Sequence, residues 1–177
     1  MTFEQDPDLA GLSSSLGREL AEEAAEDERL TAAYDRRRFD MAMVAKDMVN
    51  RGARVSVVFS GHTFSGLVIG GGSDHVTVEG AGQIGDIRLD AGYWSILPGA
   101  DEGGGDRVAT DETIMARLAE AAERGGMVRL ALAGGEIVIG RVTVVAQDHV
   151  ELTDADDRAL YVPGGLILAI LRSSSSQ

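Results

Sequence analysis

Hydrophobic residues in the first part of the chain follow the spacing of a helix. From residue 16 to residue 48 they recur at intervals of three and four, with charged residues at the gaps. Ser13, Ser14 and Ser15 offer N-cap side chains just before this stripe. The pattern predicts a helical segment over residues 13–50, as one helix or as two with a break near residues 35–38. Residues 1–12 have no period and are predicted to form a mobile tail.

At Asn50, Arg51 and Gly52 the spacing changes from helical to alternating, which is typical of a helix that ends and a strand that begins. Alternation and turn residues then predict five short strands over residues 51–98. After a glycine-rich linker, residues 99–110, a helix is predicted over residues 111–125. Five further strands are predicted over residues 126–172, followed by a disordered tail, residues 173–177.

The two strand-rich stretches are copies of one another. Both begin with an Arg-Gly pair and keep a glycine at the first turn, a Gly-x-Val motif in the second strand and an Asp-His-Val motif in the third. A Met-Ala motif repeats in the preceding helices, at Met41 and Met115. The repeated unit is therefore predicted to be a helix followed by five strands.

Five short strands in so few residues cannot enclose a sandwich core, whereas a strongly bent small barrel can bury one. The predicted fold class is therefore mainly β: an N-terminal helical segment, then two tandem five-stranded small barrels of the SH3-like type, each preceded by a helix. A barrel of this size is marginal alone, so its helix, the other copy or another subunit is expected to complete it. Tyr93, Trp94 and Tyr161 are interpreted as core or barrel-to-barrel contacts.

A helix followed by five strands, with Gly-x-Val at Gly66 and Gly140 and an Asp before the third strand at Asp74 and Asp148, resembles the Sm-like family, which includes the Hfq-type RNA chaperones. The resemblance implies a small barrel whose exposed edges pair with a neighbour, and binding of RNA. The third strand has no Asn and the later loop has no basic pair. The family's RNA pocket therefore does not carry over residue by residue.

Composition narrows the partners and the location. The 29 acidic and 16 basic residues give a net charge of −13, which opposes a general affinity for phosphate backbones. There is no cysteine, the N-terminus has no basic and apolar leader pattern, and no apolar run approaches the roughly 20 residues that span a bilayer. We expect a cytoplasmic protein with no membrane partner.

Candidate chemistry is sparse. Asp74-His75 and Asp148-His149 could be imidazoles oriented by a carboxylate, but the preferred interpretation is that each Asp stabilises a turn while the His opens a strand. Gly80 to Gly85 matches a dinucleotide-binding spacing, yet a strand-like alternation follows where that motif needs a helix. We predict no catalytic residue, no metal and no cofactor.

Arginines supply the only candidate binding strip for an anion or RNA. Arg36, Arg37 and Arg38 form a cluster that is more simply explained as offsetting the helix dipole and nearby glutamates. Further arginines lie near the predicted barrel starts: Arg51, Arg54, Arg124 and Arg129.

The predicted function is that of a non-enzymatic scaffold or regulatory protein that acts through self-association or a protein partner. The alternative is an Sm-like protein that binds RNA through local arginine clusters.

Overall fold

The computed structural model describes residues 17–18, 20–31, 40–99 and 107–174. The chain divides into two compact units, residues 1–40 and residues 41–177. In the first unit residues 20–31 are helical, and their side chains are exposed, including the apolar Leu20 and Leu30. The predicted mobile tail, residues 1–12, lies outside the described residues.

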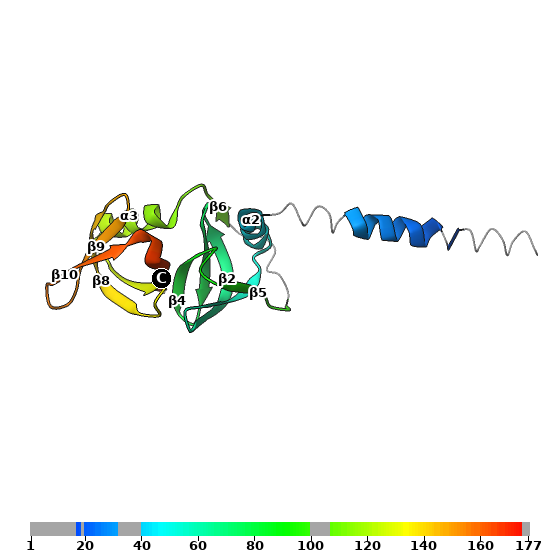
Figure 1. Ribbon diagram of the computed structural model, residues 1–177. Coiled ribbons are helices and arrows are strands. Elements are labelled where there is room, and N and C mark those ends of the chain that lie inside the picture. Colours follow the sequence, from blue (N-terminus) through cyan, green and yellow to red (C-terminus); the bar gives the residue numbers. More distant parts are fainter. Residues whose placement is uncertain (1–16, 19, 32–39, 100–106, 175–177) are drawn as a thin grey trace, which may run out of the picture. The chain divides into compact units, whose positions relative to one another are not determined.

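The second unit consists of strands with short helices (Figure 1). A glycine with a positive φ, Gly52 or Gly125, follows each of the two α-helices and turns the chain into a strand. The elements are α2 (Met41–Arg51), β1 (Arg54–Phe59), β2 (His62–Gly71), β3 (His75–Gly80), β4 (Gln83–Arg88), β5 (Tyr93–Ile96), β6 (Val108–Ala109), α3 (Ile114–Arg124), β7 (Met127–Leu132), β8 (Ile137–Val145), β9 (His149–Thr153), β10 (Ala159–Pro163), the short 3-10 helix η1 (Gly164–Leu166) and β11 (Ile167–Ser173).

The strands form one open sheet, so the predicted fold class of two small barrels is wrong. The sheet has 11 strands in the order β10-β9-β8-β7-β11-β4-β3-β2-β1-β5, with β6 pairing in parallel with β2. All other pairings are antiparallel, and the path does not close on itself. In Figure 1 the first stretch of strands is cyan and green and the second is yellow to red.

The physical reason for this difference is the pairing of β4 with β11. A small bent sheet leaves unpaired N–H and C=O groups on its outer strands, and these groups can pair with another strand. Here β4 of the first stretch and β11 of the second satisfy each other, which merges the two expected barrels. The helices do not serve separate barrels either, because α3 packs on β8 and also on β4.

We call residues 41–99 repeat 1 and residues 107–174 repeat 2, because their strands have matching registers. Val55 pairs with Gly66, and Val128 pairs with Gly140. These two glycines permit a close approach of backbones: a Cβ atom would lie 2.1 Å from Glu79 O at Gly66 and 2.9 Å from Thr153 O at Gly140. The repeated Gly-x-Val motif is therefore a requirement of strand packing.

Two hydrophobic clusters form the core. The first contains α2 side chains such as Met48 with Val55 and Val57 of β1, and the second contains Leu118 of α3 with Leu130 and Leu152. Ala169 and Leu171 of β11 belong to the first cluster, although they lie in repeat 2. The two repeats therefore share a core across the β4–β11 pair. Among the described residues, no helix is long and apolar enough to cross a membrane.

Candidate interaction site: the joint between the repeats and the free sheet edges

The joint is the antiparallel pairing of β4 with β11. It runs from the pair Ile87–Ala169 to the pair Gln83–Ser173. The first turn of α3 lies above it, because at this place the chain runs from β6, which pairs with β2 of repeat 1, to α3, which packs on β8 and β4. The joint therefore combines backbone pairing with a helix that contacts both repeats.

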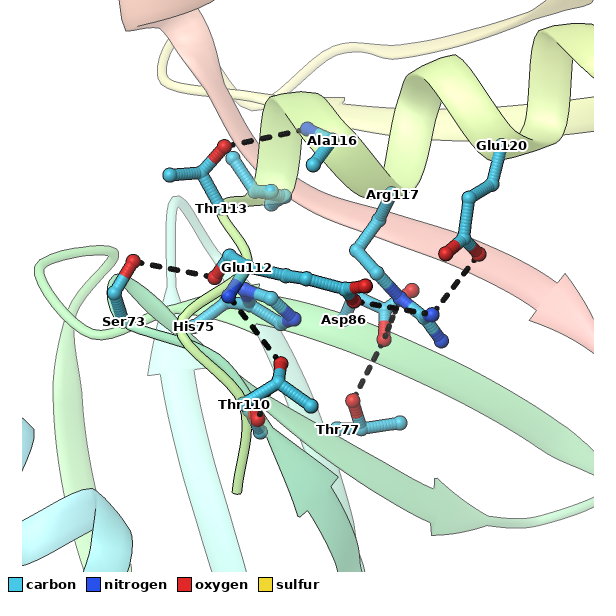
Figure 2. Close-up of polar contacts among 12 residues, drawn as sticks. Ser73, His75, Thr77, Asp86, Thr110, Glu112, Thr113, Ala116, Arg117 and Glu120 are labelled. Carbon is cyan, nitrogen blue, oxygen red and sulfur yellow. Dashed lines mark hydrogen bonds and ion pairs between the residues drawn. The ribbon is translucent and has the colours of Figure 1, made fainter. Parts of the chain in front are cut away.

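A buried carboxylate lies at the centre of the joint. Asp86 is 0% exposed, and its Oδ1 accepts a hydrogen bond of 2.8 Å from Thr77 Oγ1. Arg172 Nη2 of β11 donates to Asp86 Oδ2 over 2.6 Å. Arg117 Nε of α3 lies 3.9 Å from Asp86 Oδ1. Figure 2 shows Asp86 between Thr77 and Arg117, below the helix. Two guanidinium groups of repeat 2 thus compensate a carboxylate that repeat 1 buries.

Arg117 also carries ion pairs on the other side of its guanidinium. Its Nη1 lies 3.0 Å from Glu120 Oε2 and 3.7 Å from Glu112 Oε2. The side chain of Arg117 is 24% exposed, so it reaches from the solvent to the buried Asp86. A guanidinium suits this position because it has several donors in a fixed plane.

The Asp-His pair of repeat 1 fixes the start of α3. Asp74 Oδ1 accepts a hydrogen bond of 2.8 Å from Ile114 N and lies 3.0 Å from His75 Nδ1. His75 is 2% exposed. Thr113 is the N-cap of α3, and its side chain accepts from Ala116 N over 3.2 Å. Asp74 therefore acts as a second acceptor for the first turn of the helix.

The equivalent pair of repeat 2 lies at a free end of the sheet. Asp148 Oδ1 is 2.7 Å from His149 Nδ1, and their side chains are 88% and 39% exposed. The hydrogen bond to His149 lowers the pKa of Asp148 below its ordinary value. The His149 ring is 6.1 Å from the ring of Tyr161 on β10. Among the residues that the structure describes, no N–H of an α-helix donates to the Asp148 side chain as Ile114 N does to that of Asp74. The short helix η1 begins beside Asp148, with Gly164 N donating to the backbone oxygen of Asp148.

The sheet ends in two edges, β10 and β5. Leu97 N donates to Arg54 O of β1. Because successive N–H groups of a strand point to opposite sides, the N–H of Ile96 points away from β1. Gly164 N donates to Asp148 O, so the N–H groups of Ala159 and Tyr161 point away from β9. In the described ranges no strand pairs with the outer side of either edge. Both edges can accept a further strand.

A cavity of about 250 Å³ lies beside the joint. Its lining includes His75, Thr77, Val108, Glu112 and Arg117. Because Glu112 and Arg117 lie 3.7 Å apart, the two charges at the cavity offset each other. The cavity therefore presents no excess of one charge that would define a ligand.

Gly72 lets the chain before α3 pass close to β2 and β3. A Cβ atom at this position would lie 2.1 Å from Glu112 O and 2.3 Å from His75 Cε1. Ser73 N donates to Glu112 O over 2.8 Å, which holds this chain segment in place. The glycine run at residues 70–72 therefore serves the joint.

The candidate arginines come from both repeats. Arg51 is paired with Asp47 at 2.8 Å, and Arg124 with Glu120 at 3.2 Å. Arg54 and Arg129 lie on β1 and β7, where their side chains are exposed. The cluster Arg36, Arg37 and Arg38 lies outside the described residues.

Sequence reasoning missed the charged centre of the joint. Asp86, Arg117 and Arg172 were not among the candidate residues, and Tyr161 was considered only as a core or inter-barrel residue. A signal was present, because these are positions at which the two copies depart from one another. The residues that the two copies share report mainly on the fold.

No protein-family model matches the chain, and no curated protein matches it. Among the described residues, no three His, Asp or Glu side chains are grouped so that they could hold a metal ion.

Proposed function

We propose that this protein is a non-enzymatic structural protein that joins head-to-tail with further copies of itself through the edges β10 and β5. The observation that carries the proposal is the internal joint. There, the fourth strand of repeat 1 pairs with the last strand of repeat 2. The edges that stay free are the fourth strand of repeat 2, β10, and the last strand of repeat 1, β5.

The same kind of joint can therefore form between chains. β10 lies at one end of the sheet and β5 at the other. β10 is a fourth strand and β5 is a last strand, and inside the chain a fourth strand pairs with a last strand. Contacts between two different patches are heterologous, so they build rings when the rotation closes and filaments when it does not. Main-chain pairing along an exposed edge is a common way to bind an extended strand. Membership of the Sm-like family stays a prediction.

Light scattering on the full chain over a range of concentrations tests the proposal. We expect a mass that is a multiple of the chain mass and that falls towards one chain on dilution. A sharp monomer mass at every concentration contradicts the proposal.

A variant that removes one outward donor makes the test specific to the edge. Ala159→Pro takes away the outward N–H at the first residue of β10, a place where a strand tolerates proline. We expect roughly tenfold weaker assembly, the effect of about 1.4 kcal/mol. Ala159→Thr keeps the N–H and suits a strand, so it is the matched control and should assemble as the wild type does.

RNA binding is not proposed, because Arg51 and Arg124 are engaged with acidic neighbours and the net charge of −13 opposes binding to phosphate backbones.

A further inference from the structure

The charged centre of the internal joint has an apolar counterpart at the free ends of the sheet. The comparison begins with the fourth strand of each repeat. Asp86 of β4 pairs with Thr77 of β3, and Tyr161 of β10 pairs with Glu151 of β9. Thr77 and Glu151 are equivalent, since each follows the repeated His-Val pair by one residue. Tyr161, which is 64% exposed, thus stands at the position of the fully buried Asp86.

The last strands show the matching replacement. Val55 of β1 pairs with Ile96 of β5. Its equivalent, Val128 of β7, falls opposite Arg172 of β11, because the preceding pair in this register is Arg129 with Leu171. Ile96, which is 49% exposed, therefore stands at the position of Arg172.

The helices complete the comparison. When α2 and α3 are aligned on the glycines that end them, Gly52 and Gly125, Val44 takes the position of Arg117. This alignment is shifted by one residue from the alignment on the repeated Met-Ala motif. It places the buried Ala45 of α2 at the position of the buried Leu118 of α3, which supports it. All three charged positions of the internal joint are therefore apolar or aromatic at the ends.

We propose that β10 of one chain pairs with β5 of a second copy in the register of the internal joint, with Tyr161 packed against Trp94, Ile96 and α2 of that copy. In this register Tyr161 lies opposite Trp94, as Asp86 lies opposite Ile170. Ile96 is the diagonal neighbour of Tyr161, as Arg172 is of Asp86. This inference rests on the proposed function and names its partner, register and contact residues.

Two prolines bound the stretch that this register pairs. The strand pairs of the internal joint reach Ile87 on β4 and Ser173 on β11. Their equivalents are Val162 on β10 and Leu97 after β5, and each is followed directly by a proline, Pro163 or Pro98. Proline has no N–H to donate, so Pro163 ends the pairing on β10. Pro98 stands at the position of Ser174, whose N–H donates to Gly82 O in the internal joint, so the joint between chains is one backbone bond shorter at that end.

The difference in chemistry also separates the two joints. If β10 paired with the β11 edge of another chain, Arg172 would face Tyr161 and lose its carboxylate. If β5 paired with β4, Asp86 would face Ile96 and lose Arg172, its closest cation. Burying an unpaired charge is strongly unfavourable. The apolar ends therefore select each other, and the charged edges remain paired within the chain.

The experiment transfers the charged pair to the free ends. Tyr161→Asp and Ile96→Arg are made as separate variants, and both residues are exposed in the single chain, so each variant should keep the wild-type circular dichroism spectrum. Alone, each variant should lose assembly, because every joint would bury one charge without its partner. An equimolar mixture should recover it, because the carboxylate introduced in one variant meets the guanidinium introduced in the other, and the remaining joints are of wild-type composition.

Light scattering gives the mass, and the emission of Trp94, the only tryptophan, gives a second measurement. We expect a blue shift on assembly of the wild type and of the mixture, and none for the single variants. The control is Ile139→Asp on β8, which changes an equally exposed isoleucine away from both edges and should assemble normally.

The outcomes separate the two proposals. A monomeric wild type contradicts the proposed function itself. If the wild type assembles and either single variant assembles as well as Ile139→Asp does, the contact residues are wrong while the function stands. If both single variants fail and their mixture also fails, the register is wrong.

Discussion

At the residue scale, Asp86 decides how the two repeats hold together. Its carboxylate is fully buried on repeat 1, and its shortest ion pair, with Arg172, comes from repeat 2. A buried charge is tolerated when hydrogen bonds and a counter-charge surround it, and Thr77 with the two arginines provides both. The joint between the repeats is therefore coupled to the folding of each repeat.

Replacing Asp86 should destabilise the fold. Asp86→Ala leaves Arg172 and the Thr77 hydroxyl without their acceptor, and we expect a loss of about 3 kcal/mol in the free energy of unfolding. Urea denaturation measures it. Asp90→Ala is the control, because Asp90 pairs with Arg88 at 2.7 Å but is 68% exposed, and an exposed pair contributes no more than about 1 kcal/mol. Equal losses for the two variants would show that Asp86 does not support the joint.

The Asp148–His149 pair gives a prediction about pH. The hydrogen bond from His149 favours the charged carboxylate and so lowers the pKa of Asp148. Its contribution to stability is present above the ordinary carboxyl pKa and is lost as the pH falls through the lowered pKa. His149→Phe keeps a ring beside Tyr161 but removes the donor, so the pKa of Asp148 should rise towards its ordinary value.

Titration of the side-chain carboxyl signals by NMR follows this change. His62→Phe removes a histidine whose bond is to Gly135 O, and it should leave the Asp148 pKa where it is in the wild type. An unchanged Asp148 pKa in His149→Phe would exclude His149 as the cause of the lowered value.

At the scale of the elements, alternation in the sequence located the strands but not their neighbours. The ten predicted strands lie within a few residues of β1–β5 and β7–β11. A period of two shows which side chains share a face, and it carries no information about which strand lies alongside. The pairing of β4 with β11 joins residues far apart in the chain, so alternation could not reveal it, and two closed barrels were predicted instead.

The same limit applies to the candidate site. The Asp-His repeat was visible as a pattern, and each Asp was interpreted as stabilising the turn before the third strand. The contact of the Asp74 side chain with the first turn of α3, forty residues further along the chain, was not predicted. That the second copy of the pair lies at a free end could not be predicted, because exposure depends on which edge is covered. Tyr161 and Ile96 look like ordinary strand residues until the sheet order places them at the two ends.

At the scale of the whole molecule, the duplication and the net charge act in opposite directions on assembly. Duplication leaves a chain with one edge of each type, which favours growth from chain to chain. A net charge of −13 makes copies repel one another. Salt screens this repulsion, since the Debye length falls to about 10 Å at 0.1 M. The contacts at the proposed joint are largely apolar, so salt does not weaken them directly.

Assembly should therefore strengthen as salt is raised from low to moderate concentration. Light scattering on the full chain in sodium chloride measures this, and the mass at a fixed protein concentration should increase. The apolar ends predict this direction, whereas a joint held by charges would weaken, so a mass that falls with salt would contradict the apolar joint. The mixture of Tyr161→Asp with Ile96→Arg is the internal comparison. Half of its joints carry an ion pair that salt screens, so its mass should rise less with salt than that of the wild type.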